Sequence, residues 1–170
     1  HGFDYVQDEM NNVIIYKPAT PGYENAPTVI LQGHMDMVCE KRPDVQHDFE
    51  KDGLNLSVKD GYVTANGTTL GGDDGIAVAY ALALLDSTDL PHPALEVLIT
   101  VDEEIGLLGA VGLDCSVLKG KRMINMDSEA EGSLWISCAG GLSAVSHIPV
   151  ARVDAEGEKL QIKVCGLMGG

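Results

Sequence analysis

Acidic residues and one histidine follow three apolar segments of the chain. The segments are VILQGHMD with His34 and Asp36, VLITVDEE with Glu103 and Glu104, and MINMDSE with Asp127 and Glu129. Adjoining carboxylates repel one another and resist burial, so at the end of a core segment they need solvent, a cation or raised pKa values. Imidazole and carboxylate groups are ligands of zinc and similar ions. The residue types therefore indicate a cation site.

A fourth acidic cluster, Asp73 and Asp74, stands at the predicted start of a helix. Carboxylates also cap helices at that position, because they accept backbone N–H groups and favour the positive end of the dipole. His34 and Asp36 are two apart on a predicted strand, so Asp36 can accept from the ring N–H that His34 does not use for a metal. Singly, each motif is explained by a local hydrogen bond, a cap or a solvated loop. Their joint placement favours one shared site.

The ligand types narrow the chemistry of such a site. Histidine and carboxylates suit zinc, manganese or cobalt better than calcium. One histidine among several carboxylates suits a pair of metals ~3.5–4 Å apart, which share a bridging carboxylate and a water whose pKa falls toward neutrality. A remaining carboxylate is then available as the general base.

The segments that must position these residues alternate between strand-like and helix-like patterns, which predicts an α/β domain. The predicted strands are VIIYKPA, PTVILQGH, ALEVLITV and RMINMD. A helix apolar on nearly every face, and therefore buried, is predicted over Asp73–Ser87, and a shorter one in IGLLGAVGLD. In open α/β sheets, ligands bind outside the carboxyl ends of the strands. The acidic clusters stand at those ends.

The remaining segments are predicted to be a loop, a hairpin and a run of strands. Residues 38–50 are polar and indicate a loop, while alternation on both sides of Lys59-Asp60-Gly61 is typical of a β-hairpin. The tail, from GSLWISCAGGLSAVSHIPVAR to EKLQIKVCGL, is predicted to form consecutive antiparallel strands.

Composition excludes several classes of function. The 170 residues carry 26 acidic side chains against 11 Lys and Arg, a formal charge of −15, which disfavours nucleic acid or an anionic membrane as partner. No apolar run approaches the ~18 residues of a membrane span, and no signal peptide is visible. The 4 cysteines form no CxxC pair, so we expect reduced, mostly buried thiols and a cytoplasmic location.

Five motifs together resemble one enzyme family. They are LQGHMDMV, GTTLGGDDGIAVAYALALL, TVDEEIGLLGA, INMDSEAEG and CAGG. The combination closely resembles the metal-dependent aminoacyl-histidine dipeptidases, also called cytosolic non-specific dipeptidases, of the co-catalytic zinc exopeptidases. The spacings fit as well, with 39 positions from His34 to Asp73, 31 from there to Glu104, and 23 more to Asp127. The resemblance covers essentially the whole chain.

The resemblance implies a role for each candidate residue. Asp73 resembles the carboxylate that bridges both metals, and His34 and Asp127 resemble the other ligands of one of them. Glu104 resembles a ligand of the second metal. Asp36 resembles the aspartate that orients the histidine, and Glu103 resembles the general base. It also implies two divalent ions, with zinc the first choice and manganese or cobalt as alternatives. A cis peptide bond is expected between Asp73 and Asp74.

The implied fold is a three-layer α/β/α zinc-exopeptidase-like domain with a mixed central sheet. Residues 1–157 are expected to form the first part of the catalytic domain, and residues 158–170 the entry strand into a second, lid and dimerisation domain. The chain starts without Met and ends at GLMGG, so we expect a piece of a longer protein. The resemblance implies that the longer protein is a homodimer. In the family a late histidine completes the second metal site, so that site is expected to be incomplete here.

The implied function is metal-dependent hydrolysis of Xaa-His and other dipeptides, with small peptides as substrates and the chain by itself inactive. A related tripeptidase, aminopeptidase or N-acyl amidohydrolase stays open as an alternative. So does a non-catalytic metal-binding or assembly module. Glu103, a base without an evident structural duty, favours an enzyme.

Overall fold

The computed structural model divides the chain into two compact units, His1–Glu129 and Ala130–Gly170. It describes residues 2–128, 131–138, 140, 144–151, 154, 156–158 and 160–166. Glu129, one of the acids noted above, and parts of the CAGG motif lie outside the described residues. The expected boundary between residues 157 and 158 stays a prediction.

The first unit holds the regular secondary structure of the described chain. Its strands are β1 (Asp4–Gln7), β2 (Val13–Lys17), β3 (Val29–His34), β4 (Leu56–Lys59), β5 (Tyr62–Ala65), β6 (Leu95–Thr100) and β7 (Arg122–Asn125). Its helices are α1 (Gly72–Asp86), α2 (Leu108–Gly112) and the 3₁₀ turn η1 (Cys115–Val117). The predicted strands, helices and hairpin of this unit are confirmed, and β1 is an additional strand that the sequence pattern did not reveal.

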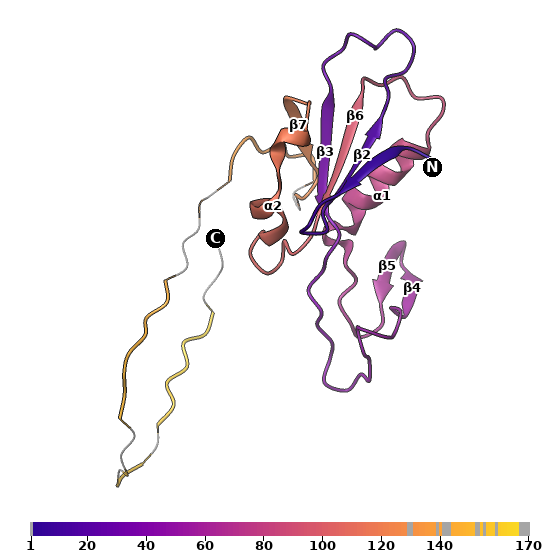
Figure 1. Ribbon diagram of the computed structural model, residues 1–170. Helices are drawn as coiled ribbons and strands as arrows, with labels where there is room; N and C mark the ends of the chain where they lie inside the picture. The colour runs from indigo at the N-terminus through magenta and orange to yellow at the C-terminus, as the bar shows by residue number, and fades with distance from the viewer. Residues whose placement is uncertain are drawn as a thin grey trace. The chain divides into compact units, whose positions relative to one another are not determined.

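A mixed sheet in the order β1-β2-β6-β3-β7 forms the centre of the unit (Figure 1). β1 and β2 pair antiparallel, as do β2 and β6, whereas β3 is parallel to both β6 and β7. Because β3, β6 and β7 run in the same direction, their carboxyl ends meet at one edge of the sheet, the lower edge in Figure 1. The mixed sheet agrees with the predicted fold class.

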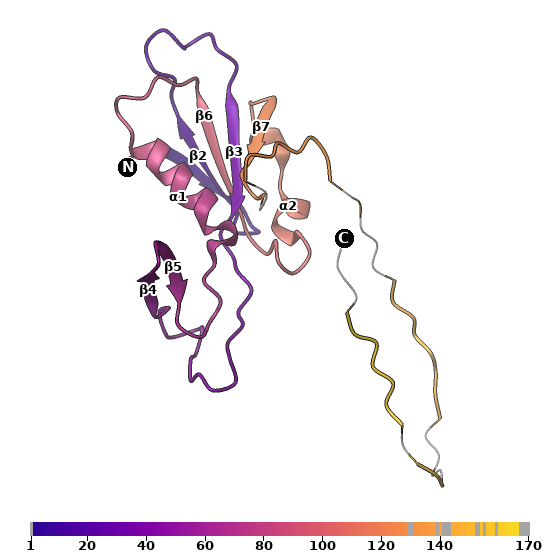
Figure 2. The same cartoon turned by 180° about the vertical axis from the view of Figure 1, so that it is seen from behind.

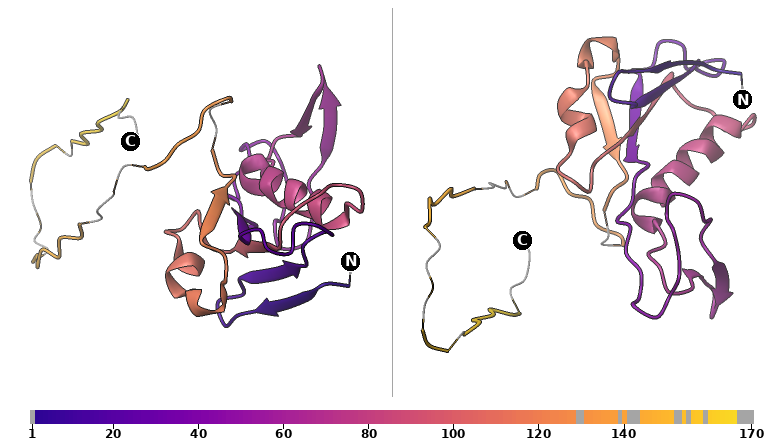
Figure 3. Two further views of the ribbon diagram at one scale, coloured as in Figure 1. Left: turned by 90° about the horizontal axis from the view of Figure 1, so that it is seen from above. Right: turned by 60° about the horizontal axis from the view of Figure 1, so that its bottom comes forward.

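Helical segments cover both faces of this sheet. α1 packs on one face (Figure 2). The core cluster on this face is formed by the buried side chains of Leu31, Ala81, Leu85, Leu95, Val97 and Ile99. On the other face Ile14, Ile30 and Leu98 pack against the segment around η1. α1 and α2 thus lie on opposite sides of the sheet (Figure 3), which confirms the predicted three-layer arrangement.

Helix α1 departs from the prediction in how it is buried. Its buried residues form one stripe, Asp74, Ala77, Ala81 and Leu85, at the spacing of a helix that packs on one side only. Ile76, Tyr80 and Leu82 are exposed, so the predicted burial of nearly every face is wrong for the described chain. The high Ala and Leu content reflects helix propensity as well as burial, which is why composition alone overstated it.

Gly33 on β3 lets α1 approach the sheet closely. A Cβ atom at this position would lie 2.5 Å from Ala77 Cβ and 2.5 Å from Asp74 Oδ2. Both are shorter than real Cβ contacts, so a side chain here would push the start of α1 away from the strand. The glycine therefore positions the acidic beginning of α1 against the end of β3.

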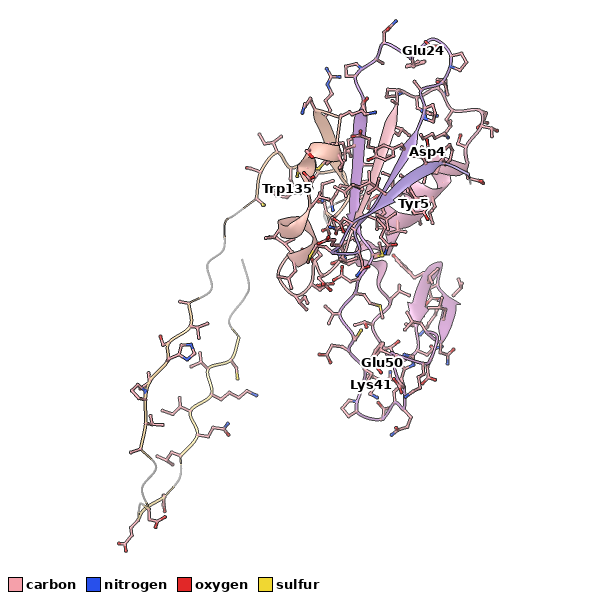
Figure 4. The ribbon with its side chains drawn as sticks, in the orientation of Figure 1. Asp4, Tyr5, Glu24, Lys41, Glu50 and Trp135 are labelled. Atoms are coloured by element: carbon pink, nitrogen blue, oxygen red, sulfur yellow. The ribbon has the colours of Figure 1, made fainter. Side chains whose placement is uncertain are left out.

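The polar segment after β3 forms the predicted loop and leads to the β4-β5 hairpin. Residues 38–50 carry no helix or strand beyond the single bridge of Lys41 with Thr68. Lys41 and Glu50 mark this loop, which lies beside the hairpin in Figure 4. The hairpin turns at Asp60 and Gly61, both with positive φ, as the sequence pattern predicts.

The described residues of the second unit contain no helix or strand, so the predicted antiparallel strands are wrong for them. Leu134, Ile136 and Ile162, which belong to the alternating pattern, are almost fully exposed. Alternation stabilises a strand only when a neighbouring strand pairs with it and its apolar face is buried. The described part of this unit offers neither.

Two expectations concern the thiols and the membrane. The cysteines are all free, as expected, but they are exposed rather than buried: Cys39, Cys115, Cys138 and Cys165. All of them lie outside the strands of the core, where packing would have covered them. Among the described residues, no helix is long and apolar enough to cross a membrane.

Candidate metal centre

The predicted site residues gather at the edge where the parallel strands end. His34 is the last residue of β3, Glu103 and Glu104 follow β6, Asp127 follows β7, and Asp73 lies in the first turn of α1. Their ligand atoms fall into two overlapping groups in which all atoms lie within 4.8 Å of one another: His34, Asp73 and Glu104, and His34, Asp74 and Asp127. Residues from four separate segments are thus brought together.

The imidazole of His34 lies at the centre of this cluster. Its side chain is only 1% exposed, and its Nε2 atom is 3.1 Å from Asp73 Oδ1. The same Nε2 is 3.8 Å from Glu103 Oε2 and 3.9 Å from Asp127 Oδ2. Three carboxylates from three segments therefore point toward one ring nitrogen.

Asp36 holds the other side of the ring. His34 Nδ1 lies 3.0 Å from the main-chain oxygen of Asp36 and 3.4 Å from its Oδ1. The carbonyl is therefore a closer acceptor than the carboxylate that the sequence suggested. Asp36 Oδ2 accepts a hydrogen bond of 3.2 Å from the Glu104 amide, which ties the end of β3 to the loop after β6. An Nδ1–H that donates to Asp36 leaves Nε2 free to face a metal.

The start of α1 directs two adjacent carboxylates in different directions. The peptide bond between Asp73 and Asp74 is cis, as expected from the resemblance. Neither residue has helical dihedral angles, and the residue before the helix, Gly71, gives no side-chain cap. Asp73 is 59% exposed and faces His34, whereas Asp74 is 1% exposed. Asp74 accepts from the Ala77 backbone N–H and so caps the helical turns, as one alternative predicted, but the contacts of both acids with His34 go beyond capping.

Sequence reasoning considered Asp74 as a helix cap or as part of an acidic cluster, but gave it no individual role in the site. Its Oδ2 accepts a hydrogen bond of 3.3 Å from the backbone N–H of His34, so it helps to fix the backbone of the residue at the centre of the cluster. A signal was available, because Asp74 falls on the same helical stripe as Ala77 and Ala81, at a spacing that predicts burial.

The crowding of acids alters their protonation. Burial raises the pKa of Glu103, and the charges of Asp127, Glu104 and Asp36 add to this against the opposing charge of His34. Burial and the neighbouring Asp73 raise the pKa of Asp127.

The pKa values of Asp74 and His34 are also shifted. Burial and the charge of Asp127 raise the pKa of Asp74 to about 6. Burial would lower the pKa of His34, but its hydrogen bond with Asp73 and the surrounding carboxylates outweigh this and raise it.

The donor set fits divalent metal ions. It combines one neutral-capable imidazole with several carboxylates, which suits zinc or manganese, and the ligand atoms converge within the distance that one ion or a pair of ions spans. Cations would also stabilise the charged forms of Glu103 and Asp127, because burial and neighbouring carboxylates raise both pKa values and the charge of His34 offsets this only in part.

Comparison with known proteins identifies relatives over the same residues. Residues 30–136, which include every candidate ligand, match the family model described as peptidase family M20/M25/M40. The chain is 44% identical over 171 residues to the cytosol non-specific dipeptidase of Escherichia coli (strain K12). That match covers 99% of this chain and 35% of the relative, so the chain spans about a third of that protein's length.

Two crystal structures share the fold. The aminoacylhistidine dipeptidase from Vibrio alginolyticus matches with a TM-score of 0.74 and 50% identity, over 77% of this chain and 27% of that chain. The aminopeptidase PepT from Bacillus cereus matches with a TM-score of 0.60 and 32% identity, over 76% of this chain and 35% of that chain. In both cases the similarity covers only part of a longer protein.

Proposed function

The chain belongs to peptidase family M20/M25/M40, and from this premise we propose that it carries the metal centre of a dipeptidase. The observation that supports the proposal is the convergence of carboxylates on His34 Nε2 at the carboxyl edge of the sheet. A solvated surface cluster would not need a buried histidine at its centre, nor segments from three strand ends and a helix.

The proposed ligands are drawn from both groups of converging atoms and divided between the ions as the resemblance implies. One divalent ion would be held by His34, Asp73 and Asp127, and a second by Asp73 and Glu104, so that Asp73 would be shared by both. Zinc is the proposed metal, with manganese or cobalt as alternatives. Two ions held in this way would polarise a peptide carbonyl and make a water molecule more acidic.

Glu103 is the proposed general base. Its Oε2 lies 3.8 Å from His34 Nε2, so it faces the proposed ions without being needed as their ligand. Burial raises its pKa, which makes the carboxylate a better proton acceptor. It takes the proton of the attacking water and returns it to the amine that leaves when the peptide bond breaks. Asp36 is the proposed positioning residue, which fixes the ring of His34 through its contact with Nδ1.

The proposed substrates are Xaa-His and other dipeptides. The names of two relatives, a non-specific dipeptidase and an aminoacylhistidine dipeptidase, support this class over the aminopeptidase alternative, because both match at higher identity. The complete protein that contains this chain is proposed to be a cytoplasmic homodimer. Its further residues are proposed to complete the second metal site and the substrate pocket.

Turnover of the Glu103→Ala variant tests the proposed chemistry. In the complete protein, loaded with zinc and supplied with an Xaa-His dipeptide, this variant should lose about 10²–10⁴-fold in kcat while it retains its metal. Asp102→Asn is the matched control, because it changes an acid of the same loop whose side chain makes no hydrogen bond or ion pair with the described residues. Near-normal turnover of Glu103→Ala would exclude Glu103 as the base.

A substrate panel tests the proposed class. The zinc-loaded protein is offered an Xaa-His dipeptide, a tripeptide with the same first two residues, and an N-acyl amino acid at equal concentration. We expect the dipeptide to have the highest kcat/KM. A preference for the tripeptide would favour the aminopeptidase or tripeptidase alternative, and a preference for the N-acyl compound would favour an amidohydrolase.

A further inference from the structure

One buried asparagine holds together the two ends of the loop that carries Glu103 and Glu104. This loop, Val101–Gly109, is called the acidic loop below, and its two end residues, Val101 and Gly109, are called its neck. Asn12, the residue before β2, is 0% exposed and lies beside both ends of the acidic loop. We infer that Asn12 is a positioning residue of the metal centre, which acts by fixing the acidic loop. The inference rests on the function proposed above, although the loop's dependence on Asn12 can be measured separately.

The amide of Asn12 uses both of its ends on the neck of the loop. Val101 N–H donates to Asn12 Oδ1 at 3.2 Å, and Asn12 Nδ2 donates to the Gly109 carbonyl at 2.9 Å. Gly109 N–H donates in turn to the Val101 carbonyl at 3.1 Å. Asn12, Val101 and Gly109 thus form a closed ring of hydrogen bonds. Val101 and Gly109 contribute backbone groups to this ring, and Asn12 contributes its side chain.

Asp8 fixes the orientation of this amide. Asp8 Oδ2 accepts from Asn12 Nδ2 at 2.7 Å, and Oδ1 accepts from the Asn12 backbone N–H at 2.8 Å. A carboxylate can only accept, so Nδ2 must face Asp8 and Gly109 while Oδ1 faces Val101. The side chain is thus held in the one orientation that fits the neck.

Gly109 shows how closely the neck is packed. A Cβ atom at this position would lie 2.3 Å from the Val101 carbonyl oxygen and 2.5 Å from Asn12 Oδ1. Because a residue with a side chain cannot approach so closely, the glycine at this point is a requirement of the same arrangement. Asn12 and Gly109 are therefore both needed for the close packing at the neck.

The rest of the acidic loop has its own internal hydrogen bonds but few to the sheet. Leu107 N–H donates to the Glu103 carbonyl at 2.9 Å, and Leu108 N–H to the Asp102 carbonyl at 3.0 Å. Both Asp102 and Leu107 have positive φ, 54° and 61°. The loop can thus keep its internal shape while its placement against His34 depends on the neck and on the Asp36 contact to Glu104.

This arrangement gives Asn12 a specific effect on the metal site. Glu103 and Glu104 stand only two and three residues beyond Val101, so movement of the neck moves both carboxylates relative to His34. Loss of groups that orient metal ligands typically costs 10–100-fold in metal affinity. We expect the second group of ligands, with Glu104, to weaken more than the group formed by His34 and Asp127.

Asn12→Asp and Asn12→Ala test the inference in the 170-residue chain. Asp keeps the size of Asn but cannot donate to Gly109, and its carboxylate faces that of Asp8. Both variants should speed amide hydrogen exchange in residues 101–109, measured without metal, and lower zinc affinity by about 10-fold or more in calorimetric titration. Glu96→Gln is the control, because it perturbs a buried polar group of the same sheet far from the loop.

Gly109→Ala and Asp8→Asn provide independent checks. Gly109→Ala should reproduce the faster exchange without changing Asn12, and Asp8→Asn should do so more weakly because it keeps an acceptor oxygen. If Asn12→Asp leaves loop exchange and zinc affinity at the values of Glu96→Gln, the inference is wrong. If Asn12→Asp does not fold, Asp8→Asn decides instead: unchanged amide exchange in residues 101–109 of that variant would also show that the inference is wrong. A wild-type chain that binds no zinc would count against the proposed metal centre, while exchange still decides the inference.

Discussion

The two ends of strand β6 bury charged groups in different ways. At its amino end lie Lys17 and Glu96, whose exposed fractions are 8% and 2%. Beyond its carboxyl end, Glu103 and Glu104 join the cluster around His34. Lys17 and Glu96 are removed from water, and Glu103 is partly removed, with 29% of its side chain exposed. Removing charge from water is costly unless each charge finds partners. The partners differ, and that difference separates a structural region from a functional one.

At the amino end, main-chain groups satisfy each charge. Lys17 Nζ donates to the carbonyls of Leu84, Leu85 and Ser87 at 2.7, 3.2 and 2.6 Å, and so caps the negative end of α1. Glu96 accepts from the backbone N–H groups of Lys119 and Gly120. Its three N···O distances are 2.9, 3.1 and 3.0 Å. These partners are fixed parts of the fold, so nothing further is needed.

At the carboxyl end, the charged side chains mainly face one another. One imidazole serves three carboxylates, and burial together with like charges raises the pKa values of Glu103 and Asp127. A structural region would be expected to satisfy such groups with backbone dipoles. The comparison teaches that burial of charge by itself does not mark a site. Burial without enough fixed partners does.

The largest expected effect is that of Asp73→Ala on metal binding. This change removes the carboxylate proposed to bridge both ions, so zinc affinity of the 170-residue chain should fall about 10³-fold, equivalent to ~4 kcal/mol. Zinc at 100 times its dissociation constant should stabilise the wild-type chain by ~2.7 kcal/mol and the variant hardly at all. Calorimetry and denaturant unfolding with and without zinc measure both effects.

A matched control for Asp73→Ala is Asp154→Ala, which removes the same charge from an exposed position in the second unit. It should leave zinc affinity unchanged. Equal losses in the two variants would mean that overall negative charge, rather than a defined site, attracts the ion. The contrast between the two ends of β6 would then have no functional meaning.

The second prediction concerns Glu96→Ala at the other end of the strand. The buried N–H groups of Lys119 and Gly120 would lose their acceptor, so the free energy of unfolding should fall by about 2–4 kcal/mol. Zinc affinity of the folded chain should not change. Denaturant unfolding followed by zinc titration in buffer measures both, and a Glu96→Ala chain that loses zinc affinity would contradict the separation of the two regions.

Lys17→Met is expected to have a smaller effect than Glu96→Ala. The carbonyls at the end of α1 can recover hydrogen bonds to water, because this helix end lies near the surface, so we expect a loss of about 1–2 kcal/mol. Lys59→Met, on the exposed β4-β5 hairpin, is the control and should change stability by less than about 0.5 kcal/mol. Equal stability of the two variants would show that the three contacts of Lys17 contribute little.

The same comparison explains what the sequence could predict. Apolar runs reveal β3, β6 and β7, and the parallel arrangement then brings their carboxyl ends together, so the cluster of His34 with its acids was accessible from pattern and spacing. Lys17 and Glu96 were not, since their partners are backbone groups of α1 and of the segment after η1. Such contacts depend on tertiary packing that no local pattern records.

Other features were missed for related reasons. Asp74 was visible on the buried stripe of α1, but it was interpreted only together with Asp73, as a helix cap or as part of an acidic cluster. Asn12 carries no local signal, because its partners Val101 and Gly109 are about 90 residues away along the chain. The tail shows the converse: alternation predicts strands only when the chain also supplies their neighbours.

The smallest expected effect belongs to Asp102→Asn, which tests whether the three adjoining acids after β6 are unequal. Asp102 has φ of 54°, a left-handed conformation that asparagine adopts as readily as aspartate. Its backbone carbonyl bonds to Leu108, and the change to Asn keeps that bond. Stability should therefore change by less than about 0.5 kcal/mol, and zinc affinity by less than about twofold.

Zinc titration of Glu104→Gln under the same conditions should show a loss of zinc affinity at least tenfold larger, because Glu104 is a proposed ligand and Asp102 contributes only charge at a distance. If the two variants weaken zinc binding equally, the acidic loop attracts the ion as a diffuse negative surface, and Glu104 is not a specific ligand.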